Sequence, residues 1–295
     1  MTTGYYPGCS LHGTAREFDE SLRAVAAAIN VPLTEIDDWS CCGASSAHTV
    51  THRLAVALPA RNLALAEAQG VEQVLAPCAA CYSRLAKARR AIEEDEALRR
   101  EMPEILGRPF RNTVAVRNVL EFLTDALPLI QPRIVRHLDG LKLACYYGCL
   151  LVRPASVTAA DDPEHPTAME QIASACGAKP VSWHMALECC GGSLSVSRTG
   201  SVIRLGRAIL EDARKAGAEA LLVGCPMCHS NLDFRQRAMA RDGRPPLPVL
   251  YVSELVGLAM GIEPERLGLE RHFVSVAPLL AGRGASPAPA PAGGH

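Results

Sequence analysis

The chain has 295 residues and a formal net charge of −1, with 48% hydrophobic and 21% charged residues. This composition is ordinary for a globular protein with room for two cores, and it includes no basic tract of the kind that binds nucleic acid. No apolar run approaches the roughly 20 residues that span a bilayer, and residues 1–6 lack a signal-peptide pattern, so we expect no membrane span, a cytoplasmic location and no nucleic-acid partner.

Hydrophobic periodicity alternates helices with short apolar strands, which favours an α/β fold. In chain order it predicts helices at 17–30 and 53–69, a buried strand at 73–77, a solvated helix face at 84–100, a linker at 128–132 and a second buried strand at 220–224. Both predicted strands end directly before a Cys-x-x-Cys pair, and Pro226 suits the first turn of the helix expected after the second pair. The pairs are therefore expected at the carboxyl ends of strands, where α/β sheets bind ligands.

Ten of the twelve cysteines form two copies of one arrangement. With the intervening residues counted, the copies read C-x31-CC-x35-CxxC and C-x39-CC-x34-CxxC. The first copy consists of Cys9, Cys41, Cys42, Cys78 and Cys81, and the second of Cys149, Cys189, Cys190, Cys225 and Cys228. In each copy the adjacent cysteines are followed by glycine, which lets a backbone come close to a cofactor.

The repeat extends beyond the cysteines, because residues 70–85 match residues 217–232 at seven of sixteen positions. We therefore expect an internal duplication with one domain at 1–132, a second at 133–274 and a disordered Ala/Pro/Gly tail at 275–295. The predicted fold is α/β, with two homologous Rossmann-like halves whose cysteine-rich loops converge at their interface.

Five thiols at each of two equivalent places indicate metal binding rather than packing, and a reducing compartment disfavours disulfides. Neighbouring side chains such as Cys41 and Cys42 diverge, so they suit different irons of one cluster better than a single tetrahedral ion. The residues thus favour iron–sulfur clusters. Zinc in at least one half and plain redox thiols remain the alternatives.

The span from Tyr5 to about Gly261 resembles the CCG-domain family, specifically the B component of heterodisulfide reductase. Beyond the two Cys-Cys-Gly motifs, the likeness includes residues 146–154, 161–169 and 235–237. The resemblance implies that each five-cysteine set binds a noncubane [4Fe-4S] cluster and that the two clusters together reduce or form a disulfide. The second copy departs slightly, with 34 residues before its last pair where the family usually has 35 or 36.

The resemblance also implies partners. These are a ferredoxin-like protein with two [4Fe-4S] clusters (the C component), a flavin-containing protein (the A component), and a small-molecule or carrier-bound disulfide or thiol. The sequence itself carries no ferredoxin cysteine run and no glycine-rich nucleotide loop after a strand, so the chain is expected to act as a disulfide oxidoreductase within a complex.

Three residues outside the two cysteine sets, and two rival functions, also need to be considered. His229 follows the second pair and is a candidate proton donor, although a packed helix residue is the simpler interpretation, and Cys145 and Cys176 are expected to be buried small residues. One rival function is a CCG-type electron-relay subunit of a quinone-linked or hydroxy-acid oxidoreductase. The other is a zinc-binding structural or interaction protein.

Overall fold

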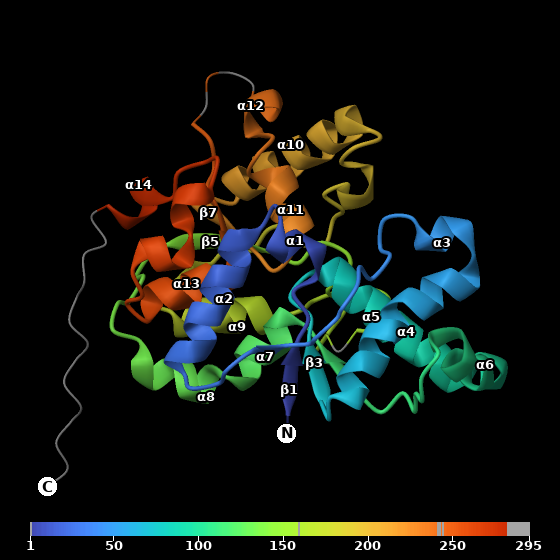
Figure 1. Cartoon of the computed structure of the whole chain (residues 1–295). Coiled ribbons are helices and arrows are strands. Elements are labelled where there is room, and N and C mark those ends of the chain that lie inside the picture. The colour runs from blue at the N-terminus through green and yellow to red at the C-terminus, as the bar shows by residue number, and fades with distance from the viewer. Residues whose placement is uncertain (1, 159, 241–242, 244, 282–295) are drawn as a thin grey trace, which may run out of the picture.

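A computed structural model describes residues 2–158, 160–240, 243 and 245–281. It contains two four-stranded parallel sheets with helices packed around them, which confirms the predicted α/β fold with two similar halves (Figure 1). The segment 282–295, most of the tail expected to be disordered, lies outside the described residues.

The strands are β1 (Thr3–Tyr5), β2 (Thr34–Glu35), β3 (Gln73–Leu75), β4 (Ala115–Arg117), β5 (Lys142–Tyr146), β6 (Lys179–Pro180), β7 (Ala220–Val223) and β8 (Val249–Tyr251). The α-helices are α1 (Gly8–His12), α2 (Arg16–Ala28), α3 (Ala47–Val50), α4 (His52–Ala68), α5 (Ala79–Glu94), α6 (Glu96–Leu106), α7 (Val119–Asp125), α8 (Leu127–Ile130), α9 (Ala168–Ala175), α10 (Thr199–Lys215), α11 (Pro226–Leu232), α12 (Gln236–Met239), α13 (Val252–Ala259) and α14 (Ala277–Leu280). Among the described residues there are also four short 3₁₀ turns, namely η1 (Gln131–Arg133), η2 (Gly192–Leu194), η3 (Pro264–Leu267) and η4 (Leu269–Arg271).

The two sheets share one topology. Their strand orders are β2-β1-β3-β4 and β6-β5-β7-β8, and every neighbouring pair is parallel. In each sheet the chain first adds a strand on one side of the starting strand and then crosses to the other side. The crossover creates a switch point between β1 and β3, and another between β5 and β7, where open α/β sheets bind ligands outside the carboxyl ends of their strands.

Most predicted elements are confirmed, because α2, α4, β3 and β7 lie within the predicted ranges to within a residue or two, and α11 begins at Pro226 as expected. The charged run at 84–100 needs a correction, since it is two helices. Asp95 separates α5 from α6, and its side chain accepts hydrogen bonds from Ala97 N at 2.8 Å and Leu98 N at 3.2 Å. Such an N-cap stabilises the start of a new helix, which the charge pattern did not reveal.

The connection between the halves is packed rather than loose. Residues 127–133 form α8 and η1, with Ile130 fully buried. The backbone N–H groups of Val135 and Arg136 both donate to Ala259 O, at 3.0 Å each. Beyond residue 274 the described chain continues into the helical turn α14, whose Leu279 is buried.

The halves meet through equivalent helices. Helix α2, which follows the first strand of its half, packs against α13, and α9, which follows the first strand of the other half, packs against α7 (Figure 1). At the first of these contacts the rings of Phe18 and Tyr251 stack at 4.2 Å, and the Ser21 and Ser253 hydroxyls lie 2.7 Å apart. Buried residues from both halves form one continuous core. This pseudo-twofold pairing brings the two switch points toward each other.

Candidate metal centre

Each half places its five cysteines on three segments, loops or the first turns of helices, that follow the carboxyl ends of strands. The single cysteine follows β1 or β5, the Cys-Cys-Gly turn follows β2 or β6, and the Cys-x-x-Cys pair follows β3 or β7. Because parallel strands share one carboxyl edge, loops far apart in sequence converge there. The convergence expected from the sequence is therefore present in the fold.

The first set is in mutual contact. Cys42 Sγ lies 3.4 Å from Cys81 Sγ, and Cys81 is also hydrogen-bonded to Cys78. Cys9 and Cys41 are hydrogen-bonded to each other, and Gly43 N donates to Cys41 Sγ at 3.4 Å.

The second set repeats these contacts position by position. Cys190 Sγ lies 3.5 Å from Cys228 Sγ, and Cys228 also contacts Cys225. Cys149 contacts Cys189, whose Sγ accepts from Gly191 N at 3.3 Å. A backbone N–H aimed at sulfur stabilises thiolate over thiol, as metal binding requires.

The two sets also meet, since the Cys78 and Cys225 thiols, one from each half, lie close enough to shift each other's pKa across the interface between the halves. The ten thiols thus gather at one place in the molecule. Their exposure is graded, with an inner group of six buried thiols and an outer rim that reaches solvent. The rim consists of Cys9, Cys41 and Cys189, which are exposed, and Cys149, which is half-buried.

The crowded thiols influence one another's ionisation. The hydrogen bond between the Cys42 and Cys81 thiols lowers the pKa of Cys42 to about 7 and raises the pKa of Cys81 well above its ordinary value. The second half repeats the pattern, with a lowered pKa at Cys190 and a raised pKa at Cys228. Packed thiolates repel, so they cannot all ionise together without positive charge among them. Iron ions of a cluster would supply that charge, and the five thiols of each set are donors that fit such a group.

In each half, the glycine before the first cysteine lets the backbone pass close to the last cysteine of the same set. Gly8 has φ +66° and Gly148 has φ +62°, in the left-handed region that favours glycine. A Cβ atom at Gly8 would lie 2.8 Å from Cys81 Sγ, and one at Gly148 would lie 3.2 Å from Cys228 Sγ. Any larger residue would push directly on a sulfur.

We therefore expect Gly8→Ala to lose about half of the protein's bound iron, measured with acid-labile sulfide after anaerobic purification. Gly70→Ala is the matched control, because Gly70 has φ +72° but a Cβ there meets nothing within 4 Å. Both variants carry a left-handed backbone cost of roughly 1–2 kcal/mol. Equal iron contents in the two variants would show that the Gly8 contact with the first set is unimportant.

Buried tyrosines three residues before the first cysteine of each set hold the Cys-Cys-Gly turns. Tyr6 OH donates to Ser40 O at 2.8 Å, and Tyr146 OH donates to Glu188 O at 2.5 Å, so each reaches the residue before the adjacent cysteines. Asn62 and Asn231 add to this support. Asn62 Oδ1 accepts from Ser40 N at 2.8 Å, and Asn231 Nδ2 donates to Cys190 O at 3.2 Å. The asparagines had no sequence signal, because neither belongs to a motif.

The remaining candidates lie apart from the thiol contacts. His229 is buried, its Nε2 donates to Val249 O at 3.1 Å, and its ring stacks on Tyr251 at 4.3 Å. Burial lowers the pKa of His229 well below its ordinary value, so its imidazole is neutral, and its role as a proton donor stays a prediction. Cys145 and Cys176 are buried, as expected of small core residues.

Comparison with known proteins gives a consistent picture. The CCG cysteine-rich domain family matches residues 3–86 and 143–233, one segment in each half. The membrane anchor subunit of 8-methylmenaquinol:fumarate reductase from Wolinella succinogenes is 32% identical over 93% of this chain and 98% of its own length. The B component of the ferredoxin/F(420)H(2)-dependent CoB-CoM heterodisulfide reductase from Methanosarcina acetivorans is 28% identical, covering 94% of this chain and 95% of its own length.

Structural comparison adds a fold-level likeness. A hypothetical protein from Helicobacter pylori superposes with a TM-score of 0.71 at 13% identity, covering 93% of this chain and 52% of that one. This chain therefore spans about half the length of that solved protein. In the part of this chain that the structure describes, we find no helix that is both long and apolar enough to cross a membrane. With one matched cysteine-rich segment in each half, the chain belongs to the CCG cysteine-rich domain family.

Proposed function

We propose that this chain is the iron–sulfur subunit of a heterodisulfide reductase-type complex, in which two noncubane [4Fe-4S] clusters reduce or form a disulfide. The observation that carries the proposal is the meeting of two complete five-thiol sets at the contact of Cys78 with Cys225. The names of three relatives support it, since each is described as the B component of a heterodisulfide reductase or as like it. The duplication suggests that 1–132 and 133–274 are the two homologous units.

Each half would hold one cluster. The first would be bound by Cys9, Cys41, Cys42, Cys78 and Cys81, and the second by Cys149, Cys189, Cys190, Cys225 and Cys228. The adjacent cysteines are differently exposed, since Cys42 and Cys190 are buried while Cys41 and Cys189 reach solvent. Such a pair can hold different irons of one cluster, and a zinc ion in one set is the minority alternative.

The reaction consumes two electrons and two protons and converts one disulfide into two thiols. When bound, the clusters would supply one-electron steps and iron to which each sulfur of the divided bond can attach. The chain's own contribution is positioning. The Tyr6 and Tyr146 hydroxyls hold the Cys-Cys-Gly turns, and six of the ten thiols are buried away from solvent. The exposed rim leaves the outer side as the route for the disulfide.

Electrons would come from a ferredoxin-like partner with two [4Fe-4S] clusters, supplied in turn by a flavin-containing partner. Multi-subunit reductases are the setting named for the relatives. The substrate would be a small-molecule or carrier-bound disulfide. A cytoplasmic location remains a prediction from the sequence.

One observation supports a second function, electron relay. The relative that is 32% identical is named as a subunit of a quinol:fumarate reductase. In that setting the two clusters would relay electrons from a quinol without touching a disulfide. We favour the disulfide reaction because two complete sets in contact suit attack on both sulfurs of one bond.

The test uses the anaerobically purified full chain. We expect no turnover with NADH, because the chain lacks a nucleotide-binding loop, and reduction of the CoB–CoM heterodisulfide or another small disulfide with reduced methyl viologen as electron donor. Thiol release is the readout. Robust NADH-driven reduction by the pure chain would contradict the proposed dependence on a partner. Oxidation of a menaquinol analogue with no thiol release from any disulfide would support the relay function instead.

A further inference from the structure

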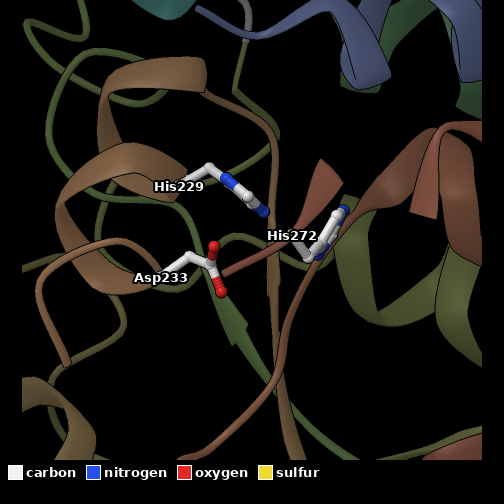
Figure 2. A group of neighbouring side chains, drawn as sticks. All are labelled: His229, Asp233 and His272. Carbon is white, nitrogen blue, oxygen red and sulfur yellow. The ribbon is translucent and has the colours of Figure 1, made fainter. Parts of the chain in front are cut away.

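A second cluster of ligand-type side chains lies beside the cysteines of the second half. His229 and Asp233 extend from one face of α11 and its end, four residues apart, toward His272, which follows η4 (Figure 2). One ligand atom from each residue lies within 4.8 Å of the other two. His229 and Asp233 are 4% and 2% exposed, and the His272 side chain is fully buried. No sequence motif joins these residues, because His272 is 39 positions beyond Asp233.

The hydrogen bonds of the two histidines leave one ring nitrogen of each for a metal. Val249 O can only accept, so His229 Nε2 carries the proton in their 3.1 Å contact and the lone pair is left on Nδ1. His272 Nε2 lies 2.8 Å from Glu254 Oε1, which again places the proton on Nε2. A ring N–H donated to a carbonyl or carboxylate is the usual outer support of a metal-binding histidine, because it fixes the tautomer and makes the other nitrogen more basic.

His272 Nδ1 is buried and has no hydrogen-bond partner. A buried nitrogen without a partner costs roughly 1–3 kcal/mol, so it calls for an explanation. With the Nε2 proton directed at Glu254, the lone pair on His272 Nδ1 meets no donor. A metal ion bound to Nδ1 would satisfy it.

Charge also favours a cation here. Three carboxyl groups are buried around the histidines, namely Glu17 at 6% exposure, Asp233 at 2% and Glu254 at 0%. Arg271 is the neighbouring cation in sequence, but it pairs with Glu20 at the surface, where the two side chains are 40% and 37% exposed. Glu254 already contacts His272 Nε2 at 2.8 Å, and burial raises the pKa of all three carboxyl groups. A divalent ion among them would favour their ionised forms.

We propose that His229, Asp233 and His272 bind one zinc ion, separate from the cysteine sets. Two imidazoles and a carboxylate with a water in the fourth position form a common tetrahedral zinc environment. Bonds of about 2 Å place the ligand atoms roughly 3.3 Å apart, so binding would draw the three groups slightly inward. Asp233 is already oriented, since its oxygens accept from Phe273 N at 2.7 Å and Val274 N at 3.0 Å. The ion would link the segment after η4 to the helix that carries Cys228.

The experiment measures zinc, iron and acid-labile sulfide in the same samples of the anaerobically purified full chain, after incubation with zinc chloride and removal of free metal. We expect about one zinc per chain, and zinc-edge X-ray absorption with nitrogen and oxygen neighbours alone. His272→Gln and Asp233→Asn should each lower bound zinc at least tenfold with iron and sulfide unchanged. Glu254→Gln should weaken zinc binding by about 10–100-fold, because it removes the outer support of His272.

His184→Gln is the control, because that histidine is 94% exposed and lies beside Asp212, outside the cluster. It should retain zinc. A wild-type chain that takes up no zinc, or zinc with sulfur neighbours, would overturn the proposal. The wild-type absorption measurement needs no variant, so a poorly folding variant does not leave the question open. Iron and sulfide report separately on the cysteine sets, so loss of clusters and loss of this site are distinguishable.

Discussion

Replacing Cys42 by serine is expected to lower bound iron from about eight to about four per chain, and replacing Cys190 by serine should do the same through the other half. Each of these thiols is buried and contacts the last cysteine of its own set, at 3.4 Å from Cys81 and 3.5 Å from Cys228. A hydroxyl is a poorer and harder donor than a thiolate, so the altered set should fail to retain its cluster.

The measurement is the content of iron and acid-labile sulfide in anaerobically purified samples of each variant. Cys176→Ser is the control. Cys176 is fully buried and lies outside both sets, so its change should leave iron near eight. Complete iron loss from either single variant would mean that the sets do not assemble independently. Given the contact of Cys78 with Cys225, that result would point to one shared centre.

Disulfide reduction is expected to fall on the order of 100-fold or more in both Cys42→Ser and Cys190→Ser, even though each variant keeps one cluster. Breaking the disulfide requires two electrons, and a single remaining cluster would supply them only one at a time. The assay is thiol release with reduced methyl viologen.

A control tests whether electrons still reach the remaining cluster. It measures, from the visible absorption of the cluster, the rate at which the same donor reduces it. That rate should stay within a few-fold of wild type. A variant that loses one cluster yet retains near-normal thiol release would contradict cooperation between the two sets and leave a single cluster as the reactive one.

The sequence predicted the fold and the thiol gathering because both follow from local rules. Apolar strands that end at Cys78 and Cys225 place each pair at a sheet edge, and the duplication implies that the second half repeats the first. It did not predict the break at Asp95, since a capping aspartate within a charged run looks like any other surface charge. Nor could it predict that Phe18 stacks on Tyr251, because that contact depends on how the two halves pack.

The contacts of the residues that hold the Cys-Cys-Gly turns could not be predicted from the sequence either. The hydrogen bonds of Tyr6 to Ser40 and of Tyr146 to Glu188 depend on the path of a separate loop. The grouping of His272 with His229 joins segments on different elements and has no counterpart in the first half, where Tyr82 occupies the position of His229. Side chains brought together only by tertiary packing leave no spacing pattern in the chain.

Iron-edge anomalous diffraction from anaerobically grown crystals of the full chain would decide whether two clusters act on one disulfide. We predict two separate groups of about four irons, one bound by each five-cysteine set, with their nearest irons on the order of 10 Å apart or less so that one disulfide can contact both. Two groups more than roughly 20 Å apart would exclude joint attack on a disulfide, and zinc in place of iron at both sets would contradict the iron–sulfur function itself.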